Sequence, residues 1–288
     1  MAKRIIIIIV FLSLVLVGIR LISGCGSGGG QGTTTVTTTT TSGTHGLTKI
    51  FFLHQSTGHG LITTGNMRGS IEAYNLKYGT SFGLWDFWSV DADNYPGLVN
   101  SSGEATRINL YEPTYTSSQT DPESLFWTWT GYNSYWTSVR TRIMDRFQVI
   151  AFKSCFGASN IDDASALQDR KNWYLAMRDF FDQHPEKLFV VMSFPPQTPL
   201  ETTATQAGYA RAFANWLKSA EYRSGHPNVV CFDLFYYLAK ADDGSADANM
   251  LQAEYRLSDP HDSHPKDNAY GIVGPKFAEF LINAALNY

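Results

Sequence analysis

Cysteine is scarce in this chain, which has 3 cysteines among its 288 residues. None of them stands with other cysteines or histidines at the spacing of a zinc site, so the sequence predicts no metal centre. An excess of positive charge is also absent, because 22 Lys and Arg face 26 Asp and Glu. Phosphate binding needs a basic surface, so we expect no nucleic-acid partner.

Long apolar runs are absent too, except for one near the N-terminus. Residues 1–24 combine Lys3 and Arg4 with the apolar run IIIIIVFLSLVLVGI and then small residues. This order of charged, apolar and small residues is typical of a signal peptide. A membrane span needs about 20 apolar residues, and this run is shorter.

The segment LISGC, residues 21–25, resembles a bacterial lipobox. By that resemblance Cys25 becomes the lipid-modified, palmitate-bearing first residue of the mature protein. Arg20 is a departure from the pattern, and a plain membrane anchor without lipid is the alternative. Residues 25–46 are mostly Gly and Thr, which predicts a flexible tether. We therefore expect the domain 47–288 at the extracytoplasmic face of the cell envelope, at the outer membrane if there are two.

Five short apolar runs within residues 47–288 predict buried strands. They are KIFFL (49–53), GLWDFW (83–88), FQVIAF (147–152), KLFVVMSF (187–194) and NVVCFDLF (228–235). Amphipathic stretches follow the later runs and predict helices. This alternation favours an α/β fold with a doubly wound, mostly parallel five-stranded sheet, in a flavodoxin-like three-layer arrangement.

Residues 66–136 interrupt the alternation and predict an aromatic-rich insertion after the first strand. Aromatic rings at the carboxyl edge of a sheet often line a binding cleft. Trp85 and Trp129 are candidate substrate contacts for this reason. The alternative is a small second core, which we expect for about half of the rings because buried aromatics are commoner.

The stretch FFLHQSTGHG, residues 51–60, places polar side chains directly after a buried strand. In a parallel sheet this loop lies at the carboxyl edge, where ligands bind. Ser56 is the candidate nucleophile, and it needs a histidine to remove its proton and an acid to orient that histidine. We expect His54 and His59 to be structural donors or substrate contacts.

The candidate bases lie in SDPHDSHPKDNAYG, residues 258–271, directly before the last predicted helix. The titratable residues of this loop that matter here are His261, His264, Asp259, Asp262 and Asp267. The loop is polar and also projects from the carboxyl edge, which brings its histidines within reach of Ser56.

Both blocks resemble those of the SGNH/GDSL hydrolase family. In that family a strand ends in the nucleophilic serine of Gly-Asp-Ser, and Asp-x-x-His-Pro precedes the last helix. FFLHQSTG is similar to the first block, with His54 and Gln55 in place of Gly and Asp, and DSHPKDNAYGIVGPKFAEFL is similar to the last. The resemblance implies Ser56 as nucleophile and His264 as base. Asp262 is the expected acid although it precedes His264 by two residues rather than three, and Asp259 is the alternative.

The resemblance also implies an oxyanion hole. The family uses the N–H of the serine, a glycine N–H after the second strand and an asparagine after the third, which here are Ser56, Gly131 and Asn160. The segment AFKSCFGASN lacks the family's Gly-x-Asn-Asp, so Lys153, Ser154 or backbone N–H groups are alternative donors.

Together these features predict a lipid-anchored serine esterase or acyltransferase that acts on a small acyl ester, with acylated carbohydrate as the suggested substrate. No metal or organic cofactor is implied. The alternative is a carbohydrate- or envelope-binding lipoprotein without catalytic activity. Lys153 either pairs with an aspartate or faces the cleft, and Cys155 and Cys231 either form a disulfide or stay thiols.

Overall fold

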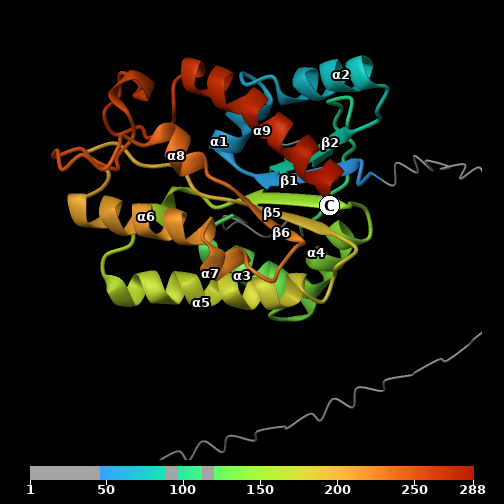
Figure 1. The fold of residues 1–288 in the computed structure, drawn as a ribbon, viewed down its shortest axis with the longest axis horizontal. Coiled ribbons are helices and arrows are strands. Elements are labelled where there is room, and N and C mark those ends of the chain that lie inside the picture. The colour runs from blue at the N-terminus through green and yellow to red at the C-terminus, as the bar shows by residue number, and fades with distance from the viewer. Residues whose placement is uncertain (1–45, 89–96, 112–119) are drawn as a thin grey trace, which may run out of the picture. The chain divides into compact units, whose positions relative to one another are not determined.

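The sheet of this protein lies between two layers of helices (Figure 1). The computed structural model describes residues 46–88, 97–111 and 120–288. Its strands are β1 (Lys49–His54), β2 (Gly83–Trp88), β3 (Leu98–Val99), β4 (Val149–Lys153), β5 (Leu188–Met192) and β6 (Val229–Phe232). The order across the sheet is β3-β2-β1-β4-β5-β6, and only β3 runs antiparallel to its neighbour. The expected α/β fold is confirmed.

Within the described ranges the sheet has six strands, one more than the five predicted. The additional strand, β3, pairs with β2 through two residues only. A strand this short shows no alternation in the sequence, so no pattern predicts it. The five parallel strands follow the order second, first, third, fourth, fifth along the chain, which is the flavodoxin-like order.

The helices divide between the two faces of the sheet (Figure 1). One layer holds α1 (Ser56–Ile62), α2 (Met67–Tyr78), α8 (Leu234–Leu238) and α9 (Asp267–Asn287). The other holds α3 (Pro122–Thr130), α4 (Ser134–Met144), α5 (Ala164–Phe181), α6 (Ala204–Leu217) and α7 (Ala220–Arg223). The short 3-10 turns η1 (Phe156–Ser159) and η2 (Ala253–Tyr255) belong to connecting loops.

Each face of the sheet has its own apolar core. Phe51 and Leu53 of β1 pack towards α3 to α6, whereas Ile50 and Phe52 pack towards α1 and α9. Successive side chains of a strand point to opposite faces, so a strand that is covered on both faces is apolar throughout. This burial explains why the strand sequences show continuous apolar runs rather than alternation.

Residues 66–136 form more regular structure than the insertion that we expect, because they supply α2, β2, β3 and α3 and begin α4. Many of their aromatic rings fill the main core instead of a cleft. Trp129 and Trp136 are buried there, while Tyr132 is 66 % exposed. Residues 89–96 and 112–119 of this stretch lie outside the described residues.

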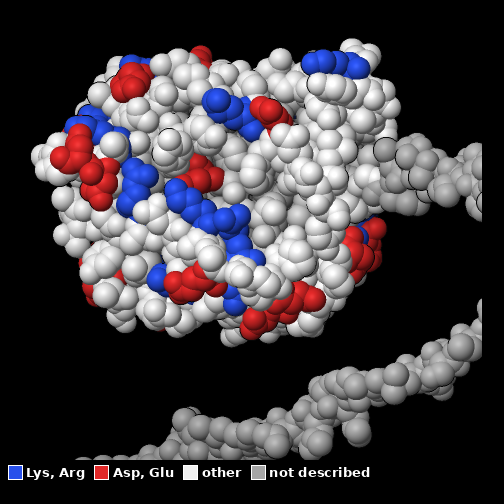
Figure 2. All heavy atoms as spheres, in the orientation of Figure 1, with Lys and Arg blue, Asp and Glu red and all other residues white. Residues whose placement is uncertain are grey.

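The surface carries few charges of either sign. On the face drawn in Figure 2, a band of basic side chains crosses the middle, and wide uncharged areas lie around it and around the acidic groups. This agrees with a sequence in which 17 % of the residues are charged. Cys25 and the predicted signal peptide lie outside the described residues, as does nearly all of the tether. No helix in the described part combines the length and apolar character that a membrane span requires.

Candidate active site

Ser56 is the first residue of α1 and follows β1 at the carboxyl edge of the sheet. Ser56 is half-buried, and its hydroxyl takes part in no hydrogen bond within the described residues. The N-cap residue Gln55 makes no side-chain cap, and the first helical bond runs from the His59 N–H to the Gln55 carbonyl at 3.1 Å. The backbone N–H of Ser56 therefore precedes the hydrogen-bonded part of the helix, as an oxyanion donor must.

His264 pairs with Asp262 in the loop before α9. The His264 Nδ1 lies 2.6 Å from Asp262 Oδ1, and the His264 backbone N–H donates to the same oxygen at 2.9 Å. Asp259 instead accepts the His261 backbone N–H at 2.9 Å, and the His261 ring lies 2.7 Å from Glu201. Of the two aspartates that the sequence leaves open, Asp262 is thus the one that contacts the His264 ring.

The other ring nitrogen of His264 has no partner. The side chain is 39 % exposed, yet its Nε2 atom is enclosed and makes no hydrogen bond within the described structure. The Phe156 ring packs edge-on against the imidazole, with 5.2 Å between ring centroids. Since Nδ1 is held by Asp262, Nε2 keeps the lone pair that a general base uses.

The turn around η1 connects the serine loop to the histidine loop. The Cys155 thiol donates to the Gln55 side-chain oxygen at 2.7 Å, and the adjacent Phe156 packs against His264. Ser56 and His264 therefore border the same short segment, although no hydrogen bond joins them in the described structure. Cys155 and Cys231 are free thiols, so the disulfide alternative is not realised.

Helix α9, which follows the loop of His264, packs against α1. Tyr270 of α9 lies so close to α1 that a Cβ atom on Gly60 would come within 2.4 Å of its ring. Burial raises the pKa of Tyr270, and the nearby Asp262 carboxylate acts in the same direction. The helix that follows His264 is thus packed directly against the helix that begins with Ser56.

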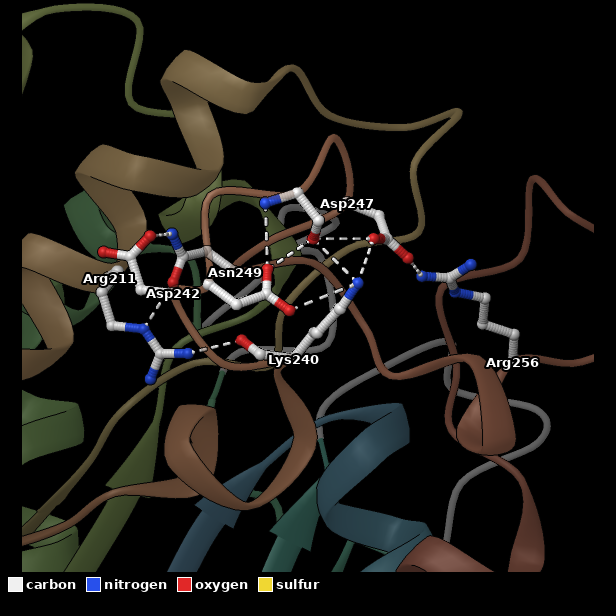
Figure 3. Close-up of polar contacts among 8 residues, drawn as sticks. Arg211, Lys240, Asp242, Asp247, Asn249 and Arg256 are labelled. Atoms are coloured by element: carbon white, nitrogen blue, oxygen red, sulfur yellow. Dashed lines mark hydrogen bonds and ion pairs between the residues drawn. The ribbon is translucent and has the colours of Figure 1, made fainter.

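The loop that carries His264 is fixed by an exposed charge network (Figure 3). Asp247 accepts hydrogen bonds from Lys240 Nζ at 2.6 Å and from Arg256 Nη2 at 3.0 Å, which lower the pKa of its carboxyl group. Arg256 in turn forms a backbone bridge with Pro265, the residue after His264. The network therefore holds the chain directly behind the candidate base.

The two other predicted oxyanion residues, Asn160 and Gly131, differ in whether they have a free hydrogen-bond donor. Asn160 follows η1, is exposed, and accepts from Gln197 Nε2 at 2.7 Å through its side-chain oxygen, which leaves its NH₂ group available. Gly131 caps α3 and donates its N–H to the Trp127 carbonyl at 3.0 Å. The helical bond consumes this N–H, so Gly131 supplies no donor at Ser56.

Gly131 also lies near the amino edge of the sheet, whereas Ser56 lies at the carboxyl edge. Its neighbour Arg140 stacks over the Phe180 ring, at 4.2 Å from the ring centroid. Phe180 belongs to the last turn of α5, which leads into β5 and therefore lies at the amino edge. The order of elements along the chain does not reveal the direction of α3, so the position of this glycine could not be predicted from the sequence.

His54 does not face the cleft, contrary to one of the two roles that the sequence allows. Its ring is fully buried, with Nε2 at 2.9 Å from Asp86 Oδ2 and Nδ1 at 3.1 Å from the Gln55 carbonyl. Arg68 forms an ion pair with the same aspartate. Burial raises the pKa of Asp86, but the hydrogen bonds and charges of His54 and Arg68 outweigh it, so the pKa is lowered. Both ring nitrogens of His54 are used, and its role is structural.

Asp86 and Arg68 form a charge cluster with His54 that could not be named from the sequence. Asp86 is the one acid inside the apolar run GLWDFW, and a buried carboxylate needs a partner. That position within a strand is the signal that could have pointed to a buried charge cluster beside Ser56.

The remaining predicted substrate contacts divide between surface and core. His59 is exposed on α1 beside Trp88, with ring centroids 5.0 Å apart, and burial and the nearby His54 lower its pKa. Trp129 is fully buried against Phe152 and cannot contact substrate. Trp85 packs against Phe147 and the same core. Of this group, His59 is thus the exposed residue on α1, whereas Trp85 is half-buried and its proposed contact stays a prediction.

Comparison with known proteins adds no constraint on the reaction. A scan against protein-family models finds no match for this chain, and a search of curated proteins finds none either. The described residues include no group of three or more His, Cys, Asp or Glu side chains that could hold a metal ion. The interpretation of the site rests on its geometry.

Proposed function

We propose that residues 47–288 form a serine ester hydrolase or acyltransferase of the SGNH/GDSL type. The observation that carries this proposal is the 2.6 Å contact between His264 Nδ1 and Asp262, which leaves an unpartnered Nε2 at the sheet edge where Ser56 begins α1. A histidine that is oriented by an acid and keeps a free nitrogen activates a serine whose hydroxyl it reaches, and this supports the proposal.

In the proposed reaction the Ser56 oxygen attacks the ester carbonyl while His264 Nε2 takes the serine proton. The Asp262 carboxylate stabilises the imidazolium that forms, and His264 returns the proton to the leaving alcohol. The Ser56 N–H and the Asn160 amide support the oxyanion. Water or a sugar hydroxyl then attacks the acyl-enzyme, which gives hydrolysis or acyl transfer.

The proposed substrate is a small acyl ester on an envelope carbohydrate. Only 17 % of the residues are charged and the formal net charge is -4, so the chain as a whole offers little attraction to a strongly charged substrate. The lipobox-like segment 21–25 and the tether 25–46 would hold the domain at an extracytoplasmic membrane surface.

A binding lipoprotein of the same fold is the second candidate. Two observations favour it: no hydrogen bond joins Ser56 to His264 in the described structure, and Gly131 supplies no oxyanion donor. One lost donor costs about 3 kcal/mol of transition-state stabilisation, a rate factor of roughly 100 to 1,000.

Labelling of the purified full chain with a fluorophosphonate probe separates the two candidates. We expect one covalent adduct, located on Ser56 by peptide mass spectrometry, and no adduct in Ser56→Ala. Ser154→Ala is the matched control, because Ser154 is buried and donates to the Thr120 carbonyl at 3.0 Å. Labelling that persists in Ser56→Ala contradicts the proposed nucleophile, and absence of any adduct in the wild-type chain favours the binding protein.

A further inference from the structure

Lys153 is a fully buried lysine on the same side of the sheet as the serine helix. It ends β4, where Val149 and Ala151 face the core under α1 and α9. Because side chains alternate along a strand, Lys153 points to this face as well. The adjacent Ser154 points to the other layer, where its hydroxyl donates to the Thr120 carbonyl.

The pairing of β1 with β4 places Lys153 beside the start of α1. Leu53 lies opposite Phe152 in this parallel pair, so the next residues, His54 and Lys153, are neighbours on one face at a strand spacing of about 4.8 Å. Helix α1 rests directly on His54, since a Cβ atom on Gly58 would come within 2.3 Å of His54 Cβ. The Lys153 side chain is thus enclosed on the face of the sheet that α1 covers, at the carboxyl edge where Ser56 begins this helix.

Lys153 has no acidic partner within the described residues. Its Nζ donates to the Ser154 carbonyl at 3.2 Å, and no ion pair involves it. The sequence left two alternatives open for Lys153, pairing with an aspartate or facing the cleft. Within the described structure the side chain has no aspartate partner, and it is fully buried. A buried ammonium without a counter-ion costs stability unless it serves another purpose.

Several ionisable groups stand on the elements around this amine. They are His54 on β1, Asp86 on β2, His59 on α1, Cys155 after β4, Tyr270 on α9, and Asp262 and His264 in the loop before α9. Burial lowers the pKa of Lys153, and the Cys155 thiol acts in the opposite direction. Asp86, the nearest buried carboxylate along the sheet, is already neutralised by His54 and Arg68.

We propose that Lys153 is a positioning residue for the Ser56 nucleophile, because its enclosed ammonium group supplies positive potential to the oxyanion that forms at the start of α1. This inference rests on the proposed esterase function and deepens it. No bond forms or breaks at Lys153: the serine proton passes to His264, and the negative charge develops on the substrate oxygen. The charge of Lys153 thereby offsets the donor that Gly131 does not provide.

The test is the rate of fluorophosphonate inactivation of the full chain between pH 6 and pH 10, in wild type and in Lys153→Met. We expect the wild-type rate to fall as the pH rises through the lowered pKa of Lys153 and the amine loses its proton. Lys153→Met should be slower at the optimum by about 10- to 100-fold and should lose the alkaline fall. Lys187→Met is the control, because Lys187 donates to the Met144 and Phe147 carbonyls at the amino edge.

The free energy of unfolding gives a second measurement, which distinguishes a role at the nucleophile from a purely structural role of Lys153. The pKa of Lys153 is lower in the folded than in the unfolded chain, so the unfolded chain binds more protons between the two values. Wild-type stability should therefore rise with pH through that window. Lys153→Met should be at least as stable as wild type at pH 7 and should lack this slope in urea unfolding.

The outcomes are distinguishable. If Lys153→Met is labelled at the wild-type rate with an unchanged alkaline fall, the role of Lys153 is overturned while the esterase proposal stands. A Lys153→Met chain that unfolds or is strongly destabilised at pH 7 makes the lysine a structural tie and also overturns the inference. If Ser56→Ala still takes the label, the proposed nucleophile itself fails.

Discussion

Asp262 and Asp259 stand three residues apart in one loop, and only Asp262 contacts the ring of His264. Burial raises the pKa of Asp262, but the hydrogen bonds from the backbone and ring of His264 lower it more, so the net shift is downward. The carboxylate therefore stays charged to lower pH than an isolated aspartate. At the scale of single residues, the loop backbone selects the acid.

The first prediction at this scale concerns Asp262→Asn. An amide in this place should let the imidazole adopt the wrong tautomer, and ester hydrolysis should fall by up to about 10,000-fold in kcat. The measurement is the steady-state hydrolysis of a chromogenic acetyl ester. Asp259→Asn is the matched change, with at most a small loss expected, and the reverse ranking would mean that Asp259 is the orienting acid.

The residue scale also shows how far sequence reasoning reaches. The pair Asp262 and His264 could be predicted because two residues that are two apart must lie near each other. The partner of His54 could not, since Asp86 is 32 positions away along the chain and reaches it only through strand pairing. Contacts across the sheet need the fold before they can be named.

Helices α1, α2 and α9 meet at a contact between glycines. A Cβ atom on Gly274 of α9 would come within 2.4 Å of the Gly65 carbonyl oxygen in the turn between α1 and α2. The apolar spacing of the last segment predicts α9, but that spacing says nothing about how near two backbones come. At the scale of elements, this close approach sets the distance between the helix of the nucleophile and the helix that follows the base.

We expect Gly274→Ala to push α9 away from the α1–α2 turn. The loss should be about 1–3 kcal/mol in the free energy of unfolding, measured by urea denaturation, with slower probe labelling of Ser56. Gly271→Ala is the control, because nothing lies within 4 Å of its added Cβ atom, and it should be neutral or stabilising by up to about 1 kcal/mol. Equal stability of the two variants would show that the contact is not tight.

At the scale of the whole molecule, the sequence predicts where the folded domain begins more clearly than it predicts the arrangement of elements within it. Composition separates residues 1–46 from the rest, and the described structure begins at residue 46. The strand runs predict a doubly wound sheet because burial on both faces removes polar residues. Strand β3 and the direction of α3 could not be predicted, since the first is too short and the second depends on packing.

Lipidation of Cys25, which the sequence predicts, can be tested on the whole chain. In a bacterial host, the mature protein should partition into the detergent phase of a Triton X-114 extract, and Cys25→Ser should release it or leave it unprocessed. Cys155→Ser is the control, because a serine there can still donate to the Gln55 side chain. Full processing and unchanged membrane binding of Cys25→Ser would exclude lipidation at this cysteine.

The packing of α9 against α1 has a consequence for biosynthesis. The candidate nucleophile is near the beginning of the folded domain and the candidate base is near its end. The serine is therefore synthesised early and the histidine late. A nascent or partly exported chain that ends before His264 lacks the base, and it also lacks α9, whose Tyr270 packs against Gly60 of α1. If the chain is exported as its N-terminal segment predicts, catalytic competence would arise only when this last segment has joined the rest of the domain.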